Sequence, residues 1–361
     1  MDSRLGNWLD ERLGFRAILD LATHKRVPEH KYSFWYYWGG ITLFFFTVMC
    51  FTGVLLLLYY RPGDEAYQSV RSITYDIQFG WLIRSTHSWS ANLMIGSAFV
   101  HMFSTYFLKA YRRPREFLWF SGVVLLLLAM GFGFSGYLLP MDDLAYFATK
   151  VGLGIPAVIP TVGPWFSNLV RGGPDISGFT VSRFFALHVV VLPALFIPVL
   201  LLHLGLIQKH GMSSPQSELD KPEDKRKTIP FFPNFAMKDL AVWLIALNVL
   251  AFCAAVFPWP LGPVADSLKP APMDIHPEWY FMSSFEVLKL FGKWIPGEFG
   301  EFAGLGLFNL GLVLWVLVPF FDPERRPGAW ARRATWFGLV VVGILLFTTI
   351  WGYAVLPAAA H

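Results

Sequence analysis

Long apolar runs alternate with shorter polar segments along the whole chain. About 20 consecutive apolar residues in helical form cross the roughly 30 Å hydrocarbon core of a bilayer. Seven runs reach this length, near residues 35–60, 80–108, 116–138, 179–207, 237–258, 300–321 and 334–356. Because a helix satisfies its own backbone hydrogen bonds in lipid, the pattern predicts an all-α membrane protein with seven transmembrane helices.

A polar segment divides these runs into four and then three. Residues 211–236 are rich in charged residues, Ser and Pro, which is typical of a linker on the inner side between two modules. We therefore expect a four-helix domain over residues 35–210 and a three-helix C-terminal domain over residues 237–361. Residues 1–34 place spaced apolar residues among charges, which predicts an amphipathic helix on the inner membrane surface.

Two other connections are longer than a turn requires, at residues 139–178 and 259–298. Both are rich in Gly, Pro and aromatic residues rather than in Ser or Lys. This composition indicates packed loops, and long packed loops often carry function.

Composition and charge support a membrane location and indicate an orientation. Hydrophobic residues make up 55% of the chain and charged residues 15%, which is too apolar for a soluble domain. With the N-terminus inside, 20 of the 29 Lys and Arg lie on the inner side, as the positive-inside rule requires. The first residues are charged and do not resemble a signal peptide. The net charge of +4 then reflects topology and lipid contact, not nucleic-acid binding.

The two cysteines, Cys50 and Cys253, lie in apolar runs and have no CxxC or CxxCH partner. They are most simply small core residues. Neither a disulfide framework nor a covalently attached c-type haem is indicated.

Four of the nine histidines fall inside two of the apolar runs. His87 and His101 lie in the second run, and His188 and His203 lie in the fourth. Spacings of fourteen and fifteen residues are close to four helical turns, so each pair projects from about one face, with roughly 21 Å between its members. Both runs cross in the same direction. His87 is therefore level with His188 near the outer side, and His101 is level with His203 near the inner side.

Two facing imidazoles at each level suit an iron porphyrin with two axial histidines. Polar groups at membrane depth are costly, which makes them candidates for function. The pattern predicts two non-covalent b-type haems, an outer one on His87 and His188 and an inner one on His101 and His203. A proton relay or a hydrogen-bonded core residue explains a single intramembrane histidine equally well, but not this matched set.

Glycines in the first and third runs repeat the fourteen-residue period. They are Gly39 and Gly53, and Gly122 and Gly136. Missing side chains at these depths would let a porphyrin edge approach the backbone, although glycine also mediates helix packing in membranes.

Arg84 and Arg183 precede the two outer histidines by three and five residues. They are placed to meet the propionates of the outer haem. Interfacial arginines without such a role are also common.

Several segments resemble the cytochrome b subunits of cytochrome bc complexes, over about residues 5–356. The likeness is carried by GGITL, YYRP, FGWLIRSTHSWSANLM, RRPREFLW, SGYLLP and HPEWYF. The resemblance is strongest to the seven-span form in the plastoquinol-oxidising complex of photosynthetic membranes, where the first four and the last three spans are separate chains. Here the two look fused at residues 211–236.

The resemblance implies the catalytic subunit of a quinol:cytochrome c oxidoreductase. Its outer site would oxidise quinol and divide the electrons between a Rieske iron–sulfur protein and the two b haems. Its inner site would reduce quinone, so that protons are translocated. A c-type cytochrome subunit, membrane lipid and a homodimer of the complex are the other partners implied.

The HPEWYF segment would supply the outer quinol site. Pro277, Glu278, Trp279 and Tyr280 match the family motif. The Glu278 carboxylate would accept a proton from a quinol hydroxyl as a general base; an interfacial carboxylate without that role is the alternative. The opposite wall is expected to come from Tyr137, Leu139, Pro140 and Tyr146.

Lys238 and Asp239, at the start of the fifth run, match a family pair that helps to protonate reduced quinone at the inner site. Ordinary charges at a helix N-terminus explain them equally well. His210 could lie nearby, but a loop histidine is more simply solvated.

Two positions depart from the photosynthetic branch. Tyr37 stands where that branch has a cysteine that anchors an extra inner haem, so we expect no third haem attached there. Met141 stands where it has tryptophan, so the pocket wall should differ. Fusion of the two modules favours a bacterial source, and hence a bacterial cytoplasmic membrane with a cytoplasmic N-terminus and a periplasmic C-terminus.

Two other classes of protein explain part of the pattern. A dihaem membrane anchor of another quinone-linked oxidoreductase would account for the histidines but not for HPEWYF. A transporter or channel would use the histidines as a proton path without a cofactor. A reduced-minus-oxidised spectrum without b-type absorption would favour that last class.

Overall fold

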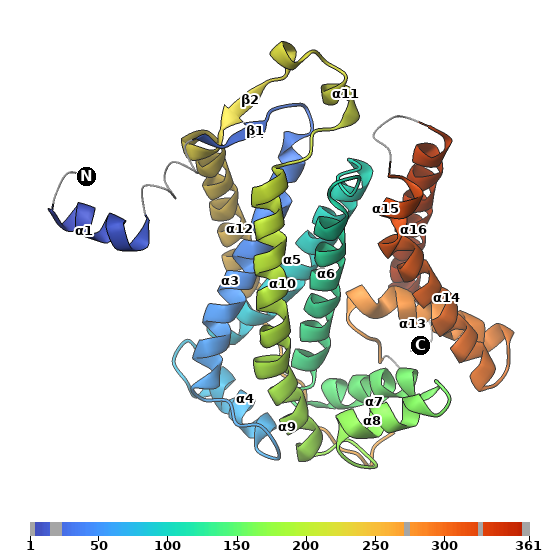
Figure 1. Cartoon of the computed structure of the whole chain (residues 1–361). Helices are drawn as coiled ribbons and strands as arrows, with labels where there is room; N and C mark the ends of the chain where they lie inside the picture. The colour runs from blue at the N-terminus through green and yellow to red at the C-terminus, as the bar shows by residue number, and fades with distance from the viewer. Residues whose placement is uncertain (1–3, 15–23, 271–274, 324–327, 356–361) are drawn as a thin grey trace.

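The computed structural model describes residues 4–14, 24–270, 275–323 and 328–355, and long helices dominate it (Figure 1). Each of the seven predicted runs coincides with a helix to within a few residues. The helices are α3 (Tyr37–Leu57), which continues a 3-10 turn at Ser33–Tyr36, α5 (Gly80–Phe107), α6 (Glu116–Tyr137), α9 (Gly178–Ala186) continued by a π-helical turn at Leu187–Val191 and by α10 (Leu192–His210), α12 (Ala236–Val256), α14 (Glu298–Val316) and α16 (Ala329–Val355). The structure is therefore mostly helical, as predicted for a membrane protein of this kind.

Within the described residues, six helices are long and apolar enough to cross a membrane. The remaining predicted span is α5, which is 28 residues long. Buried Arg84, several serines and two histidines lower its apolar character. Length alone lets α5 cross a bilayer, since 28 residues rise by about 42 Å, and the count of seven spans stays a prediction.

The main core lies between α3, α5, α6, α10 and α12, which run side by side (Figure 1). Phe45, Met94, Phe132, Phe196 and Leu250 contribute one buried side chain from each helix. The fifth predicted span, α12, thus packs against α3 and α5 rather than forming a three-helix module with α14 and α16. The last two spans pack instead with α13 (Trp279–Trp294), on the other side of the molecule (Figure 1).

One end of the bundle is closed by short helices. These are α4 (Ala66–Tyr75), which joins α3 to α5, and α7 (Asp143–Ala157) and α8 (Val162–Arg171), which lie in the first of the two long loops. Asp142 joins the loops, because its carboxylate caps α7 by accepting from the Ala145 amide at 2.9 Å and also accepts from the Gly262 amide at 3.0 Å. Both loops are packed, as their composition predicts, around a second core that contains Leu138, Tyr146 and Phe184.

The N-terminal segment and the 211–236 linker meet at the opposite end. Strand β1 (Arg26–Pro28) pairs antiparallel with β2 (Thr228–Pro230), beside α11 (Gln216–Leu219) and a 3-10 turn at Glu223–Lys225. Helix α1 (Arg4–Leu13) forms within the predicted N-terminal helix, with Trp8 exposed. Residues 15–23 of that prediction lie outside the described part. The short sheet therefore ties the linker to the start of the chain.

Candidate functional site

The four intramembrane histidines come together in two pairs between α5 and the continuous helix formed by α9 and α10. At the outer level, the His87 and His188 rings have centroids 6.4 Å apart and planes inclined by 65°. This separation leaves room for a metal ion bonded at about 2 Å to a nitrogen of each ring. At the inner level, His101 and His203 are close enough to interact electrostatically.

A π-helical turn accounts for the unequal histidine spacing. Residues Leu187–Val191 form this turn, with His188 inside it and the Leu192 amide donating to the Leu187 carbonyl. Pro193 follows, and it has no amide proton to continue the α-helical ladder. A π turn absorbs one extra residue, so fifteen residues here bring His188 and His203 to the same face that fourteen give on α5.

The four glycines of the repeated period lie against the histidines themselves. A Cβ atom on Gly136 would lie 2.8 Å from His188 Cε1, and one on Gly53 would lie 3.4 Å from His87 Cε1. In the inner pair, the corresponding distances are 3.1 Å from Gly39 to His101 and 3.2 Å from Gly122 to His203. The glycines therefore make room for the imidazoles at two levels, one glycine to each ring.

The residue before three of these glycines carries a hydroxyl that orients the histidine, and the sequence reasoning missed it. Thr52 Oγ1 lies 2.9 Å from His87 Nδ1, Ser135 Oγ lies 3.0 Å from His188 Nδ1, and Ser121 Oγ lies 2.9 Å from His203 Nδ1. The dipeptides Thr-Gly and Ser-Gly at the glycine period were the available signal. The fourth glycine follows Trp38, and His101 Nδ1 is buried with no hydrogen-bond partner among the described residues.

These hydroxyls determine which ring nitrogen is protonated. The Thr52 hydroxyl also lies 2.8 Å from the Val48 carbonyl, and the Ser135 hydroxyl lies 3.2 Å from the Phe132 carbonyl. Each O–H is donated to its carbonyl, so the oxygen accepts from Nδ1–H, and the Nε2 lone pair is left to bind a metal.

The donor set at each level fits a haem. No cluster of three His, Cys, Asp or Glu that could hold a metal ion occurs in the described ranges. Each level instead offers two imidazoles in apolar surroundings. Two axial donors are what an iron porphyrin requires, since the macrocycle supplies the other four nitrogens.

The two arginines predicted to meet propionates are engaged with backbone carbonyls. Arg84 is buried and donates to the carbonyls of Trp259 and Pro260 at 2.8 and 2.9 Å. Arg183 donates to the Leu169 carbonyl. Arg84 thus anchors the segment that follows α12 onto α5, and its role toward a propionate stays a prediction.

Glu278 is the last residue of the loop before α13 and directly follows Pro277. It occupies the N-cap position with extended backbone, and its carboxylate makes no capping hydrogen bond. Burial raises the pKa of this carboxyl, an effect that the neighbouring His276 partly offsets. The carboxylate is therefore a stronger proton acceptor than an exposed glutamate.

Trp279 and Tyr280 pack against α5 and α6, between the residues of the two histidine levels. Trp279 Nε1 donates to Asn92 Oδ1 on α5 at 2.9 Å. The Tyr280 hydroxyl lies against Gly133, one turn of α6 from the glycine that faces His188. Burial, with Glu278 and two further tyrosines, raises the pKa of the Tyr280 phenol well above its ordinary value. Tyr280 therefore stays protonated and can donate a hydrogen bond.

The residues predicted for the opposite wall lie in two places: Tyr137 is near Tyr280, whereas Leu139 and Tyr146 belong to the second core. Tyr137 is one of the tyrosines that interact with Tyr280. The Leu139 carbonyl accepts from the Tyr60 hydroxyl at 3.0 Å, and Leu139 and Met141 pack on the second core. Tyr146 lies inside that core, where its hydroxyl has no hydrogen-bond partner among the described residues. Pro140 lies between these residues in the turn after α6.

Lys238 and Asp239 face different parts of the inner end. Lys238 is exposed and forms an ion pair with Glu29 at 3.5 Å. Asp239 faces α3, because a Cβ on Gly40 would lie 2.6 Å from its Oδ1 atom. That oxygen is buried and has no hydrogen-bond partner in the described part of the chain. Since Gly39 faces His101, Asp239 lies next to the inner histidine level.

Two further residues predicted near this site are also accounted for. Tyr37 stacks on Phe235, with ring centroids 4.9 Å apart. His210 ends α10, and its carbonyl accepts from Arg115 at 2.7 Å. The inner end thus combines an aromatic stack, a buried carboxylate and the inner histidines.

Comparisons with known proteins identify the family of this chain. Residues 92–263 match the family described as Cytochrome b(N-terminal)/b6/petB, and residues 264–358 match Cytochrome b(C-terminal)/b6/petD. A cytochrome bc complex cytochrome b subunit from Chlorobaculum thiosulfatiphilum is 47% identical over 97% of this chain and 81% of its own length. Cytochrome b6 from Prochlorococcus marinus (strain MIT 9303) is 43% identical over 58% of this chain and 96% of its own.

A solved structure described as a hyperthermophilic respiratory Complex III has a similar fold. Its chain superimposes with a TM-score of 0.77 and 28% identity, over 96% of this chain and 98% of its own. Family membership implies haem b and participation in membrane electron transport. The chain therefore belongs to the cytochrome b family and joins, in one polypeptide, the N-terminal and C-terminal parts found in cytochrome b subunits of cytochrome bc complexes.

Proposed function

We propose that this protein is the dihaem cytochrome b, and the catalytic subunit, of a quinol:cytochrome c oxidoreductase. It oxidises quinol at an outer site around Glu278, divides the electrons between a Rieske iron–sulfur protein and two b haems, and reduces quinone at an inner site. The observation that carries this proposal is the position of Tyr280, one turn of α6 from the contact of Gly136 with His188. If the chain were a dihaem anchor of another oxidoreductase, the position of Tyr280 close to the outer histidines would have no function.

The histidine pairs are the proposed axial ligands. His87 and His188 would hold the outer haem, and His101 and His203 the inner one. When bound, the haems supply one-electron redox centres at two depths of the membrane. The protein's part is to present bare Nε2 atoms, to hold the rings by the hydroxyls of Thr52, Ser121 and Ser135, and to exclude water.

At the outer site, the proposed chemistry is removal of a proton from a bound quinol hydroxyl by Glu278. Only the ionised carboxylate can accept that proton, and its raised pKa makes it a better base at neutral pH. Tyr280, which stays protonated, would donate a hydrogen bond to the ring oxygen. Pro277 and Trp279 would position the loop, the latter through Asn92.

A pH profile of quinol oxidation tests the role of Glu278. The rate should fall as the pH is lowered through the pKa of Glu278, at a pH above the ordinary glutamate value of about 4.3, because protonation removes the base. Glu278→Gln should lower turnover by about 100-fold or more and remove this limb of the profile. Haem content should not change.

Glu301→Gln, on the exposed surface of α14, is the matched control and should keep the wild-type profile. Unchanged turnover in Glu278→Gln would remove Glu278 from the mechanism. Loss of b-type absorption in that variant would instead point to a structural effect.

We propose that quinone is reduced at the inner end, with Asp239 delivering a proton. Its buried, unpartnered oxygen next to Gly40 and the inner histidine level supports this role. Lys238, paired with Glu29, would hold the surface charge near neutrality. Arg84 and Arg183 are candidates for contact with the outer propionates after rearrangement.

The proposed setting is a bacterial cytoplasmic membrane with the N-terminus in the cytoplasm and the C-terminus in the periplasm. Partners would be a Rieske protein, a c-type cytochrome, membrane lipid and a second copy in a homodimer of the complex. Purification of the intact complex and identification of its subunits tests these assignments.

Variants of the hydroxyl residues test the proposed ligand geometry. Ser135→Ala should weaken retention of the outer haem by about 10- to 100-fold, because the His188 Nδ1–H loses its acceptor. A redox titration should also show a shifted potential for one haem only. Ser90→Ala is the control, since Ser90 is buried on the same helix as His87 but its hydroxyl has no hydrogen-bond partner in the described residues. Equal haem retention in both variants would contradict the assigned role of Ser135.

A further inference from the structure

His276, the first residue of the HPEWYF segment, has no part in the chemistry described so far. Its Nδ1 atom lies 3.1 Å from the Pro277 carbonyl oxygen. A carbonyl oxygen only accepts hydrogen bonds, so Nδ1 carries a proton and donates it in this bond. The Nε2 atom of the neutral ring therefore keeps its lone pair and can accept a second proton.

The His276 ring is half-buried and packs edge-on against a tyrosine of the last helix. This tyrosine is Tyr353, near the end of α16, and the two ring centroids are 5.0 Å apart with planes inclined by 69°. Tyr353 is itself 40% exposed. The ring contact and the bond to Pro277 thus hold the imidazole between the buried part of the motif and the surface.

The Glu278 carboxyl lies close to this imidazole. One residue separates the two in the chain, so their Cα atoms are at most about 7 Å apart. His276 also acts electrostatically on the carboxyl, in the direction that favours the carboxylate. A proton that leaves Glu278 therefore has an acceptor nearby.

The other titratable groups around Glu278 are phenols. They come from α6, α13 and α16, and they are Tyr137, Tyr280 and Tyr353. A phenol has an ordinary pKa of about 10, so it keeps its proton at neutral pH and does not act as the acceptor. Histidine is in general the side chain that takes up and releases protons near neutral pH. His276 is thus the base of this cluster.

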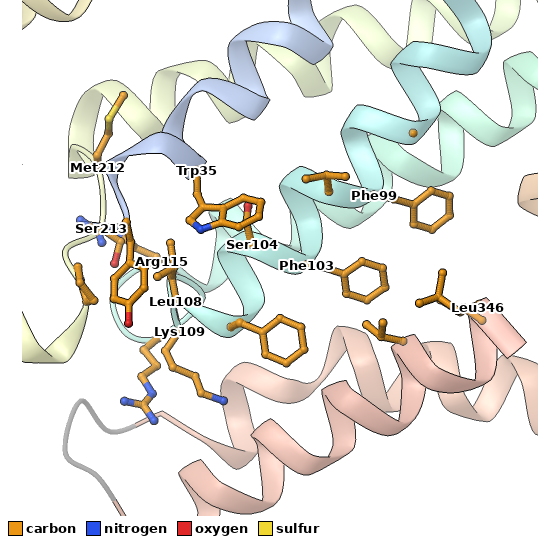
Figure 2. A pocket seen from close by; sticks show the side chains of 18 of the residues that line it. Trp35, Phe99, Phe103, Ser104, Leu108, Lys109, Arg115, Met212, Ser213 and Leu346 are labelled. Carbon is orange, nitrogen blue, oxygen red and sulfur yellow. The ribbon is translucent and has the colours of Figure 1, made fainter. Parts of the chain in front are cut away.

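A large cavity that borders the motif gives the proton no path. Its volume is about 910 Å³, and it lies between α5 and α16, where Phe103 and Leu346 face each other across it (Figure 2). Tyr280 lines this cavity, whereas Glu278 and His276 do not. A proton on the Glu278 carboxyl therefore leaves in another direction, and His276 lies in one.

The proposed role of Glu278 requires that its proton leaves after each quinol. Burial raises the pKa of this carboxyl, so the proton is held more tightly than on an exposed glutamate. The carboxylate must form again before it can accept the next proton. A second base between Glu278 and the surface would speed this step.

We propose that His276 is the proton-relay residue of the outer site, an inference that rests on the proposed oxidation of quinol at Glu278. The O–H bond of the Glu278 carboxyl breaks and an N–H bond forms at His276 Nε2, which makes the ring a cation. The imidazolium then releases the proton from Nε2 to water on the outer side. Both groups return to their starting states, and no electrons are exchanged.

Turnover of the purified complex with duroquinol as electron donor tests the relay. His276→Ala should lower turnover by at least about 10-fold, with haem content and the KM for duroquinol unchanged. An excess of free imidazole should restore most of the rate, because a diffusing base takes the proton from Glu278. A merely structural role of His276 would not respond to imidazole.

His276→Gln keeps the fold under test, because its amide can still donate to the Pro277 carbonyl. It should also be slow, and imidazole should restore less of its rate, since the longer side chain fills the space. The matched control is His24→Ala, because His24 is exposed near β1 at the opposite end of the structure. It should keep wild-type turnover with or without imidazole.

Wild-type turnover in the two His276 variants would overturn the relay. Slow turnover in His276→Ala that imidazole does not restore would overturn it as well. Glu278→Gln separates the relay from the proposed function, and it should be slow and insensitive to imidazole, because no proton reaches His276. If Glu278→Gln turns over like the wild type, the proposed role of Glu278 fails. If it is slow while the His276 variants are not, the relay alone fails.

Discussion

Replacement of Gly136 by valine is expected to reduce the haem content of the purified protein from the proposed two per chain to one. The new Cβ would lie 2.8 Å from His188 Cε1, which is closer than such contacts occur, so the imidazole must move. A ligand nitrogen that moves by even 1 Å no longer reaches a metal bonded at about 2 Å. The outer haem should therefore be lost, while His101 and His203 keep the inner one.

Reduced-minus-oxidised spectra, with haem measured per chain, provide the measurement. Gly205→Val is the control, because it lies on α10 near His203 and a Cβ there meets no atom within 4 Å. It should retain both haems. Two haems with wild-type spectra in Gly136→Val would contradict the assignment of His188 as a ligand.

Removal of the Asp322 carboxylate is expected to destabilise the protein more than loss of any surface ion pair. Asp322 is buried, and it accepts from Arg112 Nη2 at 2.8 Å, from Arg112 Nε at 3.1 Å and from the Tyr111 hydroxyl. In Asp322→Ala, two buried cations, Arg112 and Lys109, lose their shared counter-charge. Breaking one side of a buried ion pair costs about 3–5 kcal/mol.

Thermal unfolding of the purified protein in detergent measures this effect. Asp175→Ala is the control. Asp175 forms an ion pair with Lys150 at an N···O distance of 3.3 Å, and both side chains are half exposed. Such a pair contributes only about 0–1 kcal/mol. Equal stability of the two variants would contradict a stabilising role for the buried ion pair of Asp322 with Arg112.

Much of the fold could be predicted because membrane helices follow a one-dimensional rule. Each span needs its own length of apolar residues, and each of the seven predicted runs matches a helix. That rule does not predict which helices pack against one another. Residues 211–236 suggested a division of four and three, but α12 packs against α3 and α5 because its buried Ala246 and Leu250 complete the main core.

The candidate site could also be predicted only in part. Periodicity along single helices was enough to select the four histidines and the four glycines, and the HPEWYF segment was enough to select Glu278. The partners of these residues come from other helices, so spacing carried no information about them. Thr52, Ser121 and Ser135, which orient three histidines, were missed for this reason, as was the use of Arg84 to hold Trp259 and Pro260.

The sequence by itself determined the membrane class, the helical spans, the two histidine levels and the family resemblance. Each of these depends on the order of residues within one helix or one motif. Only the tertiary structure decided that the glycines face imidazoles, that a π turn aligns His188 with His203, and that the Lys109 ammonium has no hydrogen-bond acceptor among the described residues. These features arise where side chains from distant segments compete for the same space or the same charge.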